Sequence, residues 1–134
     1  MRAVRKTMSP FHSPSPTFTF SALYRSPLIA RYRVTNTYGS AITTSPAWTT
    51  LHATFTDNSS AGSVVAKLIR VDKCNNTETT LCTITSSDGA DPQCATCSFN
   101  NGDIDFANYQ YYVQVTLSRS NSTAVEALHS VSID

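Results

Sequence analysis

The sequence predicts an all-β protein: a single β-sandwich, jelly-roll-like, of seven or eight antiparallel strands behind an extended N-terminal arm. Two observations carry this prediction. Apolar side chains recur at every second position through most of the chain, and turn-forming residues separate these segments at intervals of roughly 8–12 residues. The chain has 134 residues, of which 14% are charged, and this length suits one domain with a core of its own.

The clearest strand signals lie at the C-terminal end. Apolar or aromatic residues alternate with polar ones from Tyr109 to Leu117, and the alternation resumes from Thr123 to Ile133 after a polar break. Successive side chains of a strand point to opposite faces, so each segment reads as a half-buried strand. The two segments are predicted to form an antiparallel hairpin. Further strands are expected at residues 17–24, 28–35, 47–57, 62–72, 77–87 and 93–99.

Charge is distributed unevenly along the chain. Residues 1–56 contain six basic residues and no Asp or Glu, whereas residues 57–134 contain four basic and nine acidic residues, and the net charge is +1. Residues 1–16 include the proline-rich "SPFHSPSP" and are predicted to be an extended basic arm, with residues 17–134 forming the sandwich domain. A solvated tail is the alternative. The candidate assembly residues of the arm are Arg2, Arg5, Lys6 and Phe11.

Four cysteines lie within one short stretch, and disulfides are their favoured interpretation over zinc because only one pair has the spacing of a zinc knuckle. Cys82 and Cys94 are placed symmetrically about Asp88, so a hairpin turning there would join them and leave Cys74 for Cys97. The alternative pairs Cys74 with Cys82 and Cys94 with Cys97. Either pairing indicates an oxidising compartment.

Other sites are weakly indicated. The histidines, His12, His52 and His129, are scattered and none accompanies a nucleophile motif. Alternating Asn101, Asp103 and Asp105 suggest a calcium loop, but a polar turn is favoured because the Gly and distal Glu of an EF-hand are missing. No catalytic residue, metal ion or cofactor is expected. Four aromatic residues could stack on a sugar, although a sandwich core uses the same residue types: Trp48, Tyr109, Tyr111 and Tyr112.

Compartment and membrane topology follow from what the sequence lacks. No apolar stretch is long enough to span a bilayer. Polar residues and prolines follow the basic N-terminal residues where a signal peptide needs an apolar run. The chain is therefore expected to be leaderless or to have lost its leader.

Residues 50–134 show a family resemblance. The runs "DNSSAGSVVAKLIRVD", "TLCTITSSDGA" and "IDFANYQYYVQVTLSRSNSTAVEALHSVSI" resemble poorly characterised bacterial β-sandwich proteins, secreted or surface-associated, with phage-related members. The shared features are the strand rhythm and the "YYV.VTLSRS" strand. The resemblance implies an extracellular or cell-surface location, or a virion, and it supplies no catalytic residues. The cysteines and the proline-rich start depart from the pattern.

Three classes of function remain. The first is a non-enzymatic structural subunit that self-assembles into an extracellular or virion-type filament or lattice through its arm. The second is a carbohydrate-binding module, which needs a row of exposed aromatic rings. The third is a coat protein that lines nucleic acid, but the arm has too few basic residues to favour a nucleic-acid partner. The chain itself is the expected partner.

Overall fold

The computed structural model describes residues 4–8, 18–19, 27–36 and 44–134, and every structural statement below refers to them. They form strands and no helix, in agreement with the all-β prediction. The strands are β1 (Val4–Met8), β2 (Phe18–Thr19), β3 (Leu28–Val34), β4 (Thr50–Asp57), β5 (Gly62–Asp72), β6 (Glu78–Thr85), β7 (Gly89–Ser98), β8 (Tyr109–Arg119) and β9 (Glu126–Ile133).

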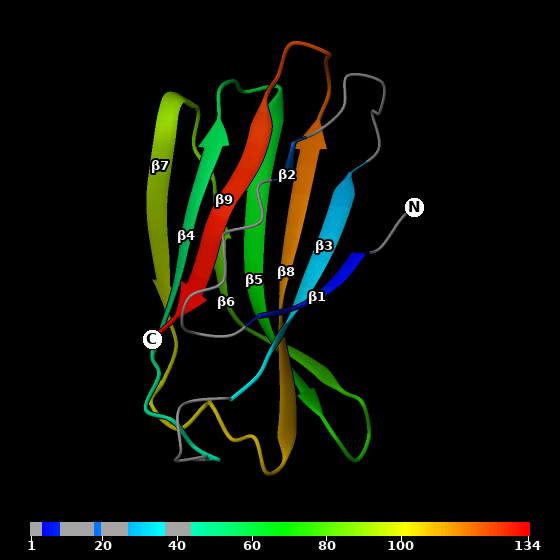
Figure 1. Ribbon diagram of the computed structural model, residues 1–134, viewed down its shortest axis with the longest axis vertical. Helices are drawn as coiled ribbons and strands as arrows, with labels where there is room; N and C mark the ends of the chain where they lie inside the picture. Colours follow the sequence, from blue (N-terminus) through cyan, green and yellow to red (C-terminus); the bar gives the residue numbers. More distant parts are fainter. Residues whose placement is uncertain (1–3, 9–17, 20–26, 37–43) are drawn as a thin grey trace.

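Two sheets face each other across one core (Figure 1). Sheet A has five strands in the order β1-β3-β8-β5-β6, and sheet B has four strands in the order β2-β9-β4-β7. All pairs are antiparallel except that between β1 and β3. The two layers each bury the alternate side chains of one face, which is the stable arrangement for half-apolar strands.

Strands β2 to β9 pair in a nested order. The innermost pair is β5 with β6, and around it lie β4 with β7, β3 with β8, and β2 with β9. Each pair thus joins segments farther apart in sequence than the pair inside it, as along one long hairpin. The additional pairs β4–β9 and β5–β8 close this ribbon into the two sheets. Strand β1 lies outside the nest, at the edge of sheet A.

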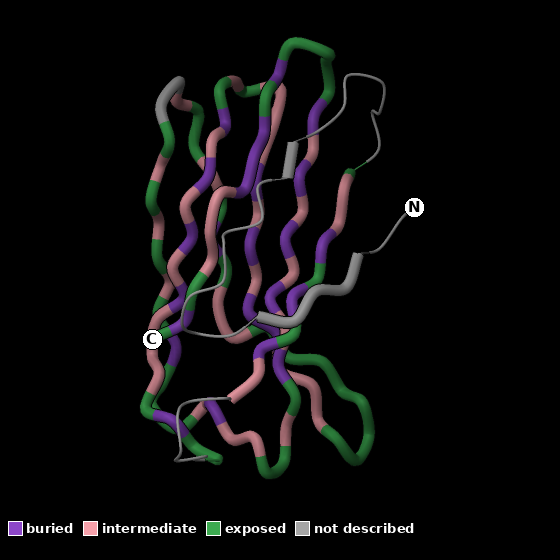
Figure 2. Tube along the Cα trace, viewed as in Figure 1, coloured by how far each residue is buried: buried purple, intermediate pink, exposed green. Residues whose placement is uncertain are grey.

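The core consists of the alternate side chains that the sequence pattern selects. Buried positions alternate with less buried ones along β3, β4, β5 and β8 (Figure 2). On sheet A, Tyr32 of β3 lies opposite Val113 of β8, which lies opposite Leu68 of β5. All three are at most 1% exposed. Sheet B contributes the buried side chains of Leu51, Ala53, Phe55, Leu128 and Ile133.

The hairpin predicted for the two C-terminal strands is wrong. Strand β8 pairs with β3 and β5 in sheet A, whereas β9 pairs with β2 and β4 in sheet B. The link between them turns on Asn121, whose Oδ1 accepts hydrogen bonds from the backbone N–H groups of Thr123 and Ala124 at 3.1 and 2.8 Å. Asn58 then anchors Val125 to the end of β4 at 2.8 Å. The polar break therefore carries the chain from one sheet to the other.

Strand β9 also departs from the regular alternation of side chains between two faces that the sequence predicts for it. Its register with β4 shifts between Thr54 and Phe55, which face Ser130 and Leu128 respectively. The extra residue on β9 is a β-bulge, and a bulge moves the following side chains to the opposite face. Leu128 and Ile133 are consequently both buried, although they are five positions apart and would lie on opposite faces of a regular strand.

Candidate assembly surfaces

The predicted arm is described only from Val4 to Met8. This segment is a strand that runs parallel to β3 of its own chain, with Arg5 in register with Arg31 and Thr7 with Arg33. It is therefore not a free extension in this structure. Arg2 and Phe11, the other two candidate contact positions, lie outside the described residues, whereas Arg5 and Lys6 lie within β1.

A basic strip follows β3 on the outer face of sheet A. Arg31 and Arg33 are both exposed. The Nε of Arg31 donates a hydrogen bond to Oε1 of Gln114 at 3.0 Å, and its guanidinium carbon lies 5.2 Å from the ring centroid of Tyr112. Cation–π contacts of this kind are favourable but small at exposed sites. The Tyr112 ring is thus engaged by Arg31 on this face.

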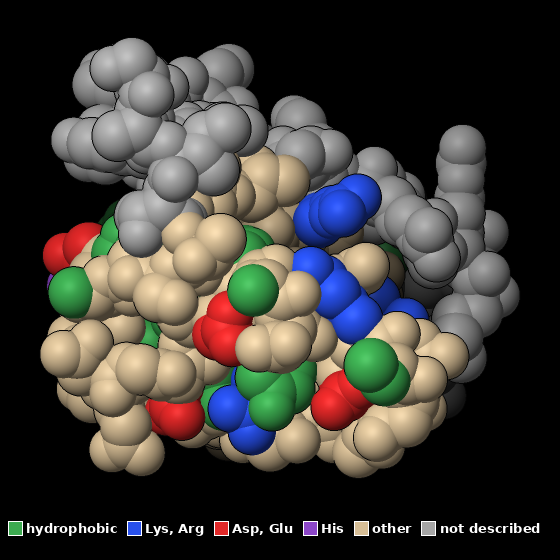
Figure 3. Space-filling view, turned by 90° about the horizontal axis from the view of Figure 1, so that it is seen from below, with side chains coloured by type: hydrophobic (Ala, Val, Ile, Leu, Met, Phe, Trp, Pro, Cys, Tyr) green, Lys and Arg blue, Asp and Glu red, His purple; other side chains and the backbone are tan. Residues whose placement is uncertain are grey.

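The other three candidate sugar-stacking rings belong to Trp48, Tyr109 and Tyr111. They lie where β8 begins, at the lower end of the molecule in Figure 1, and belong to the margin of the core. Tyr111 is 1% exposed. Its ring packs edge-on against Phe106 and Tyr109, with centroids 5.1 and 6.5 Å away, and Phe106 packs edge-on against Trp48 at 6.0 Å. From below, apolar side chains form separate small groups among charged ones (Figure 3). These rings close the core and do not form a row on the surface.

The Tyr111 hydroxyl group ties this aromatic cluster to the loop before β8. It donates to the carbonyl oxygen of Asp103 at 2.8 Å and accepts from the N–H of Asp105 at 2.7 Å. Burial is the main cause that raises the pKa of Tyr111. The hydroxyl therefore stays protonated and able to donate at neutral pH.

We expect Tyr111→Phe to lower the free energy of unfolding by about 1–3 kcal/mol, because it leaves two half-buried backbone groups without their partner. Urea denaturation measures this loss. Tyr109→Phe is the matched control, since Tyr109 is only half-buried, and it should change stability by less than about 0.5 kcal/mol. Equal effects from the two substitutions would show that the hydroxyl bonds of Tyr111 do not hold the loop.

The acidic side chains of this loop serve as local turn acceptors. Asp105 accepts from the Ala107 N–H at 2.8 Å and from the Asn108 side chain at 2.7 Å, and the Asn108 bond is the main cause that lowers the Asp105 pKa. Asp103 accepts from the Asn100 N–H at 2.8 Å. These are the bonds of a polar turn. Across the described ranges, no group of three or more potential ligands is positioned to hold a metal ion.

The disulfide joins Cys82 to Cys97, with the two Cα atoms 5.9 Å apart. The pairing expected from symmetry about Asp88, Cys82 with Cys94, is wrong, as is the alternative. Strand β6 pairs with β5 in sheet A, and β7 pairs with β4 in sheet B, so no hairpin turns at Asp88. The disulfide instead links the edge strands of the two sheets. Cys74 and Cys94 are exposed free thiols.

A buried acidic pair, which is not among the predicted site residues, occupies the upper end of the core. Asp57 of β4 lies opposite Glu126 of β9, and the two are 1% and 0% exposed. Ser86 donates to Oδ2 of Asp57, while the remaining oxygens of both carboxyl groups have no hydrogen-bond partner among the described residues. Burial first, and then the Asp57 charge, raise the pKa of Glu126.

Two neighbours complete this buried group. Arg119 of β8 is 8% exposed, and its positive charge partly offsets the rise in the Glu126 pKa. Gly62 of β5 lies against the Glu126 side chain, where an added Cβ would overlap the carboxyl group. The alternation of apolar and polar residues could have located two members of this group. Asp57 is in phase with the buried Leu51, Ala53 and Phe55, and Arg119 is in phase with Leu117.

The two described histidines make separate polar contacts on sheet B. His52 Nε2 lies 2.7 Å from a carboxyl oxygen of Asp134, and both side chains are largely exposed. His129 Nε2 lies 2.8 Å from the hydroxyl oxygen of Thr56. His12 falls outside the described residues.

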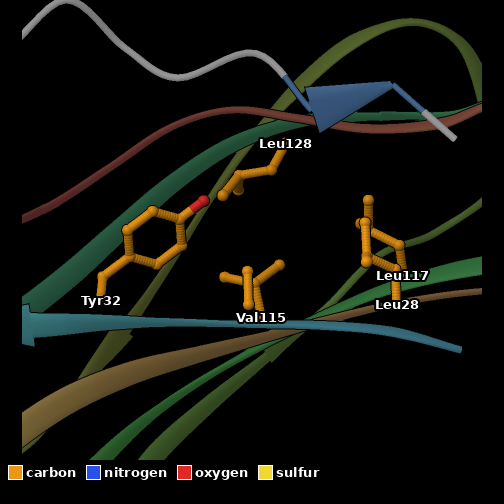
Figure 4. A pocket seen from close by; sticks show the side chains of 6 residues that line it. Leu28, Tyr32, Val115, Leu117 and Leu128 are labelled. Carbon is orange, nitrogen blue, oxygen red and sulfur yellow. The ribbon is translucent and has the colours of Figure 1, made fainter. Parts of the chain in front are cut away.

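A small apolar cavity lies between the sheets near β2. Its lining carries one hydroxyl group, that of Tyr32, which points toward Leu128 (Figure 4). Burial raises the pKa of Tyr32 to about 12. The remaining lining is hydrocarbon, which offers no hydrogen bonds to a sugar: Leu28, Ala30, Val115, Leu117 and Leu128.

Comparison with known proteins gives no relative: no protein-family model, curated protein or solved structure matches the chain. Within the described residues, no helix has the length and apolar character needed to cross a membrane.

Proposed function

We propose that this chain is a non-enzymatic structural subunit with a jelly-roll fold, which assembles with copies of itself into a filament or lattice of extracellular or virion type. The observation that carries the proposal is the nested pairing of β2 to β9. An eight-stranded antiparallel ribbon rolled into two sheets is the order of the jelly roll, which builds many viral coat and lectin domains.

The arm provides the contact between subunits in this proposal. Strand β1 is additional to the nested eight, so its removal leaves every pair of the nest in place. Among the described strands it pairs with β3 alone, and in the parallel arrangement, which is slightly less stable per residue than the antiparallel one. An acidic surface on a neighbouring subunit competes well for such a strand.

The lower end of the molecule is the acceptor for the basic arm in this proposal. Asp72, Glu78 and Asp105 lie there, at the β5–β6 turn and in the loop before β8, beside Arg70 and Lys73, and Figure 3 shows side chains of both charges on this end. A contact between the arm and a different surface of the neighbour is heterologous, so it builds a ring or a filament. Exposed charge pairs contribute only about 0–1 kcal/mol each, so Phe11 and strand-edge pairing supply the remaining affinity.

We expect Arg5→Glu to weaken assembly several-fold, because one reversal replaces an attraction to the acceptor with a repulsion. Lys67→Glu is the matched control, because Lys67 lies on the outer face of β5 and is not part of the arm. Sedimentation velocity measures the assembled fraction. Equal losses from both variants would contradict a role for the arm and leave only a general effect of net charge.

Location in an oxidising, extracellular environment is supported by the Cys82–Cys97 disulfide. Carbohydrate binding is the alternative function for the same fold. It lacks a supporting surface among the described residues, since Tyr111 is in the core and Arg31 lies over Tyr112.

A further inference from the structure

The outer edge of β7 is an open sheet edge. Strand β7 ends the order of sheet B, and no described strand lies beyond it. Its exposed residues include Cys94, Thr96 and Ser98. An edge of this kind presents unpaired N–H and C=O groups and is a template for pairing with another chain. Only the backbone groups that point away from β4 are free for such pairing.

The hydrogen bonds between β4 and β7 show which backbone groups of β7 point outward. The Phe99 N–H donates to the Thr49 carbonyl oxygen at 2.8 Å, in continuation of the β4–β7 ladder. Partners in an antiparallel ladder alternate between hydrogen-bonded and non-hydrogen-bonded pairs. Residues in phase with Phe99 on β7, such as Ala95 and Cys97, therefore direct their backbone groups toward β4. The backbone groups of Cys94, Thr96 and Ser98 point away from the sheet.

Only the C-terminal part of this edge lacks the usual protection against pairing. Asp91 and Pro92 lie in its N-terminal part, but the segment "QCATCS" from Gln93 to Ser98 contains no charged residue, whereas natural open edges commonly carry Lys, Pro or another protecting residue. The register shift in the β4–β7 pair also lies toward the N-terminal end of β7, where Asp57 faces Gly89. Pro92 has no N–H to donate, so pairing with another chain is expected only from Gln93 onward.

We propose that β7 pairs antiparallel with β7 of a second copy around a two-fold axis at Thr96, which joins two four-stranded sheets into one continuous sheet. In this register Thr96 faces Thr96, Cys94 faces Ser98, and the outward N–H groups of these three residues on both strands find a carbonyl oxygen. A register centred on Cys94 or Ala95 would instead place Pro92 opposite a carbonyl oxygen that receives no donor. The contact is isologous and uses the same residues on both subunits.

This interface deepens the proposed function and rests on it. The arm supplies a heterologous contact at one end of the molecule, and the β7 edge adds a two-fold contact along its side. A lattice or a double filament needs both kinds of contact, whereas the arm alone gives a ring or a single filament.

Cross-linking the full-length chain tests the register. Both free thiols are first removed by Cys74→Ser and Cys94→Ser, and Thr96→Cys or Ser98→Cys is then added. Oxidised glutathione accepts two electrons and two protons from a pair of thiols, which yields the protein disulfide and two reduced glutathiones. Partners in a hydrogen-bonded pair are about 5.5 Å apart at Cα, within disulfide range. Two Ser98→Cys positions would be about 13 Å apart along the strands.

We expect roughly tenfold more covalent dimer from Thr96→Cys than from Ser98→Cys on non-reducing gels. Ser98→Cys should regain cross-linking when Cys94 is restored, because those two residues face each other. This second comparison does not depend on the folding of the Thr96 variant. Equal yields from the two positions, or none from Thr96→Cys in material that sedimentation shows to be assembled, would overturn the β7 contact while the proposed function stands. A chain that is monomeric and not cross-linked would overturn both.

Discussion

Replacement of both Cys82 and Cys97 by Ala should lower the free energy of unfolding by about 3 kcal/mol, the value expected for a loop of this length. The two residues are 15 apart in sequence, and the bond ties the edge of sheet A to the edge of sheet B. Without it, only side-chain packing holds the two edges together. Urea denaturation in the absence of reductant measures the loss.

The matched control replaces Cys74 and Cys94, which are exposed free thiols. These changes should alter stability by less than about 0.5 kcal/mol. If instead Cys94→Ala alone cost as much as the Cys82 and Cys97 change, the pairing inferred from symmetry about Asp88 would be restored. Mass spectrometry of the alkylated native chain should find two labelled thiols, Cys74 and Cys94.

Glu126→Gln should raise the free energy of unfolding at pH 7 by roughly 1–3 kcal/mol, because it removes a buried charge beside Asp57 and retains the shape of the side chain. Burial holds the pKa of Glu126 above its ordinary value of 4.5, so the folded chain binds this proton more tightly than the unfolded chain. The stabilisation from this proton is fully present below pH 4.5 and is lost as the pH rises through the folded-state pKa.

The difference in stability between Glu126→Gln and the original chain should therefore widen as the pH increases from 4.5 toward neutrality. Glu78→Gln is the control, since Glu78 is exposed, and it should show no such widening. Denaturation curves collected at several pH values measure this difference. A constant difference across the range would mean that Glu126 titrates in the folded chain as it does in the unfolded one.

Strand positions were largely predictable because burial on one face leaves a period of two in the sequence. The predicted strand at residues 62–72 has the same bounds as β5, and the inward residues of β8, from Tyr111 to Leu117, were identified from alternation alone. Alternation reports which face of a strand is buried. It carries no information on which strand lies beside it.

Strand pairing was therefore the part that the sequence could not predict. Both predicted hairpins joined neighbours in sequence, whereas β8 and β9, like β6 and β7, belong to different sheets. The nested order joins residues as distant as Phe18 and Leu128, and no local pattern links them. The cysteine pairing failed for the same reason, because it depended on the hairpin at Asp88.

Sedimentation velocity of the full-length chain over a wide concentration range tests the central claim most directly, with the chain lacking residues 2–16 measured in parallel. Self-assembly through the arm predicts that the mean mass of the full-length chain rises with concentration, while the truncated chain remains a folded monomer with the circular dichroism of a β-protein. High salt should slow the assembly more than it dissolves the finished polymer, because exposed charges guide the encounter. A full-length chain that stays monomeric at every concentration, or a truncated chain that assembles equally well, would contradict the structural-subunit account.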